Sequence, residues 1–228
     1  MKRYFLYTFL FFGGNLFSQS NSNKLEFTID SDTSFWLKHN SRIIEKIGLS
    51  TPIYPNKFLR ISSSKYFVEL TNDSAKVIFH VNEILESKRT GESFTTKYYL
   101  TKEQIIKIYK LYKSLDLENI PSDSYILEWQ FGTDGMSYII ESKTDSFYSF
   151  KKYWTPSSQK KFIESERILE FTNQLDSTIN YRQLRKDFES KIPYYGWTYE
   201  GSIWSAFRPI TNWKLYKRYK RSKRKLKT

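Results

Sequence analysis

The chain has 228 residues, and its 37 Lys and Arg residues exceed its 24 Asp and Glu residues to give a formal net charge of +13. It contains no cysteine, which excludes disulfide bonds and the attachment of a lipid to an N-terminal cysteine. Aromatic residues make up 18% of the chain, but an AT-rich genome enriches Phe, Tyr and Lys through codon bias, so this abundance alone does not indicate a ligand.

Residues 1–20 have the composition of a secretory signal peptide. Two basic residues come first, an apolar and aromatic run follows from Tyr4 to Phe17, and serines stand at positions 18 and 20 before the expected cleavage point. The alternative is a membrane anchor, but as a helix this run reaches about 21 Å, whereas the hydrocarbon core of a bilayer is about 30 Å thick. We therefore expect cleavage after Ser20 and a periplasmic or secreted protein without a transmembrane span.

Residues 21–100 are predicted to form a strand-rich half with one helix. Alternating apolar residues predict a strand at 24–30. The spacing of Trp36, His39, Ile43 and Ile47 predicts a helix that ends at Gly48. Runs of β-branched and aromatic residues separated by Ser, Asn and Asp predict further strands at 58–62, 65–70, 75–84 and 94–100.

Residues 101–213 are predicted to contain a helix, three antiparallel strands, a second helix and an aromatic hairpin. Thr101 and Gln104 suit a capping box at the start of the first helix, and Thr155 and Pro156 suit the start of the second. Strands are expected at 125–131, 136–140 and 147–154, with an Asp134-Gly135 turn joining the first two. This order of elements predicts an α+β fold, an antiparallel sheet or sheets with amphipathic helices packed on one face.

The sequence does not suggest a catalytic, cofactor or metal site. Its two histidines, His39 and His80, are expected to be structural. The stretch from Asp134 to Glu141 matches the second half of a calcium-binding EF-hand loop, but Gln130 and Gly132 stand where the first half needs carboxylates or Asn. A hairpin turn is the better interpretation of that stretch.

The aromatic hairpin spans residues 194–207, YYGWTYEGSIWSAF. If Glu200-Gly201 is a two-residue turn, the side chains of four aromatic residues lie on one face of the hairpin, because directly opposed residues share a face. This wall either closes the core over the sheet or forms an exposed platform that stacks on sugar rings or on a partner's apolar surface. Its members are Tyr195, Trp197, Tyr199 and Trp204.

Residues 214–228 form a basic tail without any acidic residue. Of the 37 basic residues, nine lie in this tail and two in the leader, which leaves 26 in the rest of the chain against 24 acidic residues. As a helix, the segment would have aromatic residues on one side and most of its cations on the other. The nine candidate anion-binding residues are Lys214, Lys217, Arg218, Lys220, Arg221, Lys223, Arg224, Lys225 and Lys227.

An exported chain meets anionic lipid headgroups, glycolipid phosphates and acidic polysaccharide, so an envelope component of this kind is the expected partner of the tail. Nucleic acid would be the favoured partner of such a segment in the cytosol, and a disordered solubilising tail without a partner is the alternative. The sequence as a whole favours an exported, non-enzymatic, envelope-associated binding protein. A secreted enzyme acting on glycans and an interaction or inhibitor protein for a secreted partner stay open as other classes.

Overall fold

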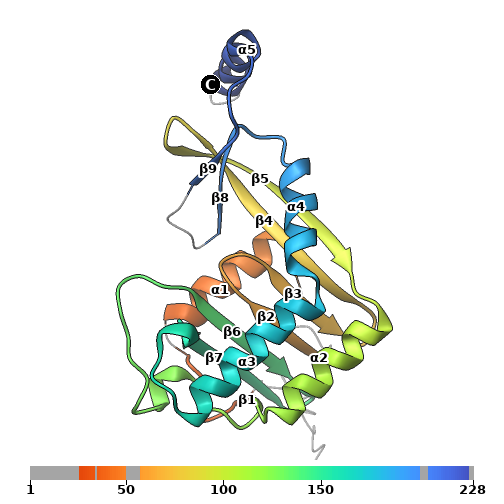
Figure 1. Ribbon diagram of the computed structural model, residues 1–228, viewed down its shortest axis with the longest axis vertical. Coiled ribbons are helices and arrows are strands. Elements are labelled where there is room, and N and C mark those ends of the chain that lie inside the picture. The colour runs from red at the N-terminus through yellow and green to blue at the C-terminus, as the bar shows by residue number, and fades with distance from the viewer. Residues whose placement is uncertain (1–25, 34, 50–56, 201–204, 226–228) are drawn as a thin grey trace, which may run out of the picture.

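The computed structural model describes residues 26–33, 35–49, 57–200 and 205–225. The strands of this part of the chain join in one nine-stranded sheet with the order β1-β7-β6-β2-β3-β4-β8-β9, and β5 pairs with β4 outside that path (Figure 1). Pairing is antiparallel except between β1 and β7. The predicted α+β fold is confirmed, whereas the signal-peptide prediction falls on residues 1–20, which lie outside the described residues.

The described residues before position 100 are mainly strands. β4 is long enough to pair with β3 and β8 along one edge and with β5 along the other. The predicted strand at 24–30 is described from Glu26 onward and pairs over two residues. The bounds are β1 (Glu26–Phe27), α1 (Phe35–Lys46), β2 (Phe58–Ser62), β3 (Phe67–Thr71), β4 (Ala75–Leu85) and β5 (Lys88–Tyr99).

The elements after residue 100 alternate between helices and pairs of strands. The capping box expected at Thr101 and Gln104 is present at the start of α2. The bounds are α2 (Lys102–Ser114), η1 (Asp123–Tyr125), β6 (Ser137–Lys143), β7 (Phe147–Trp154), η2 (Pro156–Ser158), α3 (Ile163–Thr178), α4 (Tyr181–Lys191), β8 (Gly196–Tyr199), β9 (Ser205–Phe207) and α5 (Trp213–Lys225). Within the described residues, every helix is too short or too polar to cross a membrane.

Helices α2, α3 and α4 cover one face of the sheet and enclose the main hydrophobic core with it (Figure 1). Ile108 of α2, Phe171 of α3 and Phe188 of α4 are fully buried there. The ring of Phe188 lies 5.2 Å from that of Phe79 in β4, which fixes α4 against the sheet. Burial of each such side chain contributes about 1.5–3 kcal/mol to folding.

Helix α1 packs on the opposite face of the sheet. Ile44 and Ile47 form a smaller cluster with Phe67 and Ile78. Phe67 and Ile78 are paired across β3 and β4, and their neighbours along each strand belong to the main core, so the two clusters lie on opposite faces.

The predicted strand at 125–131 and its turn at 134–135 are wrong. This segment is irregular after η1, and Trp129 packs into the core, where its Nε1 donates a hydrogen bond to the Trp154 carbonyl at 2.9 Å. A hairpin through residues 134–135 would pair such a strand with β6, but both edges of β6 are occupied, one by β2 and the other by β7. The unit therefore has two strands between α2 and α3.

The start of the second predicted helix also differs. Pro156 takes the first position of η2, a single 3₁₀ turn, while α3 begins only at Ile163. Thr155 has φ 39° and makes no side-chain capping bond. Asn180, with φ 55°, separates α3 from α4, a left-handed conformation that Asn tolerates better than most residues.

Candidate functional site

The basic C-terminal segment forms helix α5, from Trp213 to Lys225. Asn212 caps it, since its Oδ1 accepts hydrogen bonds from the main-chain N–H groups of Lys214 and Leu215 at 3.0 and 3.1 Å. Like charges three or four positions apart destabilise an isolated helix by about 0.2–0.5 kcal/mol per pair. Contacts with the rest of the molecule are therefore needed to hold this helix in place.

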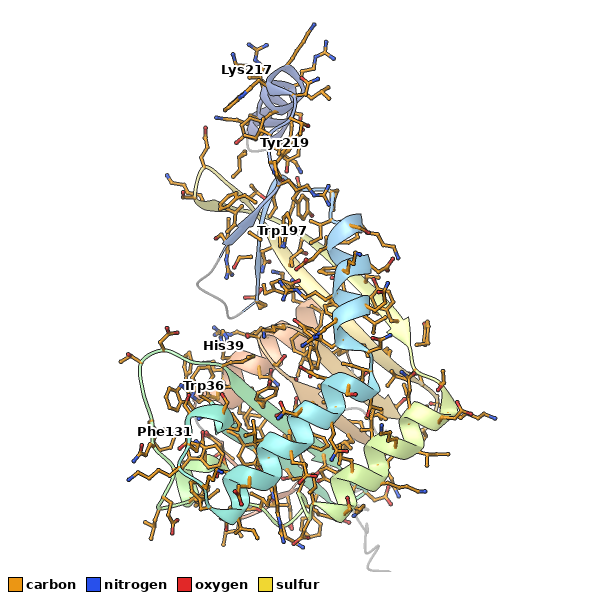
Figure 2. The ribbon with its side chains drawn as sticks, viewed as in Figure 1. Trp36, His39, Phe131, Trp197, Lys217 and Tyr219 are labelled. Carbon is orange, nitrogen blue, oxygen red and sulfur yellow. The ribbon has the colours of Figure 1, made fainter. Side chains whose placement is uncertain are left out.

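One side of α5 packs on the aromatic residue that precedes β8. The rings of Tyr216 and Tyr219 each lie 5.0 Å from the ring of Tyr195 in edge-to-face geometry. The Tyr219 hydroxyl also donates a hydrogen bond to the carboxylate of Glu83 near the end of β4. Figure 2 shows Tyr219 between α5 and the strands below it.

The same side of α5 carries two lysines that bind the acidic tip of the β4–β5 hairpin. Lys220 pairs with Glu86, and Lys223 pairs with Glu92 and lies 3.4 Å from Glu83 Oε2. The Glu83 side chain is 0% exposed. Burial alone lowers the pKa of Lys223, but the hydrogen bond that Lys223 donates to Glu92 and the charges of both carboxylates outweigh burial and raise that pKa. Lys223 therefore stays charged and neutralises a buried carboxylate.

The opposite side of α5 presents four cations to solvent. Lys214, Lys217, Arg218 and Arg221 follow the i, i+3, i+4, i+7 spacing of one helix face, and all four are exposed. Within the described part of the chain none of them has an ion-pair partner. Figure 2 shows Lys217 on the side turned away from the body of the protein. We call these four residues the outer stripe.

The structure thus separates the nine predicted cations into groups with different roles. Four form the outer stripe, and two, Lys220 and Lys223, are bound to carboxylates of the sheet. The side chains of Arg224 and Lys225, together with Lys227, lie outside the described residues.

The aromatic residues of the predicted wall occupy separate environments. Trp197 is 6% exposed and belongs to the main core. Tyr199 packs against that core, and its hydroxyl donates to Glu189 Oε1 at 2.9 Å. Tyr195 packs against α5, while Trp204 lies outside the described residues. The rings of the described members are therefore used in packing.

The predicted register of this hairpin is shifted by two residues. Trp197 pairs with Ala206 and Thr198 with Ser205, whereas a two-residue turn at 200–201 would have placed Trp197 opposite position 204. The connection between β8 and β9 spans 200–204, so the turn prediction is wrong.

Both histidines lie on or near the α1 face of the sheet. His39 is half-buried and stacks on Phe35 at 5.6 Å. His80 is 3% exposed; its Nδ1 is 2.8 Å from Thr95 Oγ1, and its Nε2 is 4.0 Å from Glu200 Oε2. Burial, reinforced by the charge of Lys46, lowers the pKa of His80 to about 4. His80 is therefore neutral near pH 7.

A buried ionic network lies on the same face. The Arg60 guanidinium, which is 0% exposed, donates to Glu69 Oε2 at 3.0 Å and to Glu141 Oε1 at 3.2 Å. Lys76 binds the second Glu69 oxygen at 3.1 Å, and Asn40 of α1 donates to Glu141 at 2.9 Å. Glu141 stands at the position of the last ligand in the partial calcium-loop match. In the structure it accepts hydrogen bonds from Arg60 and Asn40.

The sequence analysis did not identify the acidic residues of the sheet that bind α5. Glu83, Glu86 and Glu92 lie close together in the sequence around the β4–β5 turn. This acidic cluster is the one local feature that could have indicated a site for basic side chains. Nothing in the spacing of a single sequence indicates that they bind cations more than a hundred residues away.

Among the described residues, no group of three or more His, Asp or Glu side chains is arranged to hold a metal ion. A surface hollow of about 410 Å³ lies along α3 and is lined by exposed residues of both charge signs, including Lys160, Lys161, Glu166 and Glu170. The chain matches no protein-family model, no curated protein and no solved structure.

Proposed function

We propose that the protein is exported and binds a phosphate-bearing anionic surface of the bacterial envelope through the outer stripe of α5. The observation that supports this proposal is the division of α5 into a docked side and a solvent-facing side. The docked side holds the helix to the sheet, so the four outward cations are presented on an ordered helix at one end of the molecule (Figure 1).

Two exposed apolar side chains favour a lipid or glycolipid surface over a purely polar polyanion. Trp213 is 63% exposed and Leu215 is 52% exposed, and both lie in the first turn of α5 on either side of the outer stripe. An interfacial helix combines basic residues for the headgroups with Trp and Leu for the boundary of the acyl chains. Acidic polysaccharide and nucleic acid would leave these two side chains without an apolar partner.

The charge sets an upper limit on this interaction. Each Lys or Arg near an anionic surface contributes about 1 kcal/mol, so the four described cations contribute about 4 kcal/mol at most. The Debye length falls from about 10 Å at 0.1 M salt to about 3 Å at 1 M. The proposed association is therefore reversible and sensitive to salt.

Vesicle sedimentation tests the proposal. The mature chain should sediment with vesicles that contain anionic phospholipid at low salt, remain in the supernatant with vesicles of neutral phospholipid, and be released by 1 M salt. The variant Lys214→Gln/Lys217→Gln/Arg218→Gln/Arg221→Gln should lose this binding. A charge-matched control is Lys102→Gln/Lys107→Gln/Lys110→Gln/Lys161→Gln, which removes four exposed cations from elsewhere and should bind normally.

Two further measurements test the choice of an anionic lipid surface over nucleic acid and the export of the chain. Tighter binding to duplex DNA than to anionic vesicles would replace the proposal with a nucleic-acid role. Export is tested by expression in a bacterial host, fractionation and mass measurement: loss of residues 1–20 from an envelope or periplasmic fraction is the expected result, and an intact cytoplasmic chain would contradict it.

A further inference from the structure

A second candidate site lies on the α1 face of the sheet, away from α5 (Figure 2). A cavity of about 110 Å³ opens between α1, the turn joining β2 to β3, and the segment before β6. One water molecule needs about 10–15 Å³ of such space, so the cavity admits a larger group. Its lining includes Trp36, His39, Asn40, Ser62, Ser63 and Glu200.

Ser62 supplies a buried polar group in this cavity. It is 2% exposed, and its Oγ has no hydrogen-bond partner among the described residues. Ser62 alternates along β2 with Leu59 and Ile61 of the main core, so its side chain lies on the α1 face. Buried hydroxyl groups are nearly always hydrogen-bonded, and one that lines a cavity without a partner marks a position for a polar group of a ligand.

Trp36 supplies an aromatic surface at the same cavity. Its side chain is 37% exposed, and its ring meets that of His39 edge-to-face at 6.0 Å. Figure 2 shows the two residues beside each other on α1. Binding cavities for small molecules combine aromatic walls with a few polar groups that set the orientation of the ligand. The C–H face of a sugar ring packs on an aromatic ring of this kind while its hydroxyl groups reach polar partners.

The charge of the lining favours a neutral ligand. The cavity residues of the described chain include no Lys or Arg. Their one carboxylate, Glu200, is already paired with Lys46 at 3.6 Å and Arg89 at 3.2 Å. An anionic ligand would therefore find no free cation here. A single carboxylate is also not the pair that glycosidic hydrolysis uses, so the chemistry is binding.

We infer that this cavity binds a neutral sugar residue of a glycan, with one sugar hydroxyl hydrogen-bonded to Ser62 and the ring packed on Trp36. The two contacts come from different elements, β2 and α1, so they fix both the position and the orientation of the ring. This inference depends on neither α5 nor its proposed anionic surface.

The sugar-binding inference is tested by titrating the full chain with glucose, galactose, mannose and N-acetylglucosamine. Binding is monitored by tryptophan fluorescence and by NMR shifts of residues around the cavity. Glucuronate serves as the anionic comparator. We expect saturable binding of at least one neutral sugar, with shifts centred on Trp36 and Ser62. The absence of saturable binding for all four neutral sugars would overturn the inference, and so would tighter binding of glucuronate.

Two variants assign the contacts. Ser62→Ala removes the unpaired hydroxyl without adding volume, so the fold should be retained while sugar affinity falls about tenfold, the loss of one hydrogen bond. Trp36→Ala should weaken binding by a similar factor, and Tyr99→Ala, which alters an exposed aromatic residue of β5 that does not line the cavity, should leave it unchanged. Normal sugar affinity in both Ser62→Ala and Trp36→Ala would contradict the assignment.

Discussion

Basic side chains on the α1 face of the sheet and on the outer stripe of α5 differ in their burial and in their ion-pair partners. Arg60 is 0% exposed and lies between Glu69 and Glu141. Lys217 and Arg218 are exposed and have no ion-pair partner in the described part of the chain. The first group is neutralised within the fold, whereas the second keeps its charge available at the surface.

The difference shows that a cation's role depends on its partners rather than on its residue type. α5 contains both situations in one helix, because Lys220 and Lys223 bind carboxylates while the outer stripe faces solvent. Buried charges that lose a partner destabilise the fold strongly, whereas exposed charges that are removed change stability little. Substitutions in the two groups should therefore affect different measurements.

The largest effect is expected at Arg60. Arg60→Met leaves Glu69 and Glu141 buried without their shared cation, and we expect a loss of about 3–5 kcal/mol in the free energy of unfolding, measured by urea titration. The triple variant Arg60→Met/Glu69→Leu/Glu141→Leu removes the buried charges together and should recover most of this loss. A loss below about 1 kcal/mol for Arg60→Met would place this network among weak surface pairs.

The next effect is the pH dependence caused by His80. The pKa of His80 is lowered to about 4 in the fold by burial and by the charges of Lys46 and Arg89, against the opposing charge of Glu200. An unfolded chain protonates this histidine near pH 6.5, so the free energy of unfolding should fall by up to about 3 kcal/mol between pH 6.5 and pH 4.

The control for that experiment is His80→Gln, measured over the same pH range. The variant lacks the titrating ring, so the difference in unfolding free energy between the two proteins should shrink as the pH falls. A difference that stays constant between pH 7 and pH 4 would show that His80 is not held neutral by the fold.

A smaller effect is expected where α5 meets the sheet. Glu83→Ala removes a buried acceptor from Tyr219, Lys223 and Thr90, and we expect a loss of about 1–3 kcal/mol, with faster amide exchange in α5. Glu86→Ala removes an exposed partner of Lys220 and should cost less than about 1 kcal/mol. Equal losses of unfolding free energy in Glu83→Ala and Glu86→Ala would contradict the expectation that the buried carboxylate contributes more than the exposed one.

Helices α1 and α2, the body of α3 and many strand positions were predictable because hydrophobic periodicity is local, whereas α4 was not predicted. The capping box at Thr101 and the amphipathic spacing of α2 needed only neighbouring residues. The strand prediction at 125–131 failed for a non-local reason: the alternation is typical of a strand, but β2 and β7 already occupy both edges of β6.

The candidate site was predictable in part. The sequence indicated the density of cations in α5, but which of them face solvent follows from Tyr195, Glu83 and Glu92, residues brought to the helix by the tertiary fold. The cavity beside Trp36 was missed because its polar group, Ser62, lies in β2, and the sequence does not show that α1 packs near the face of the sheet on which Ser62 lies.

The most direct test compares the two sides of α5 in one vesicle-binding assay. The outer-stripe variant Lys214→Gln/Lys217→Gln/Arg218→Gln/Arg221→Gln should bind anionic vesicles at least about tenfold more weakly, with its free energy of unfolding changed by less than about 0.5 kcal/mol. The docked-side variant Lys220→Gln/Lys223→Gln should be less stable and retain most of its affinity. Unchanged vesicle affinity of the outer-stripe variant, or a greater loss in the docked-side variant, would contradict the account.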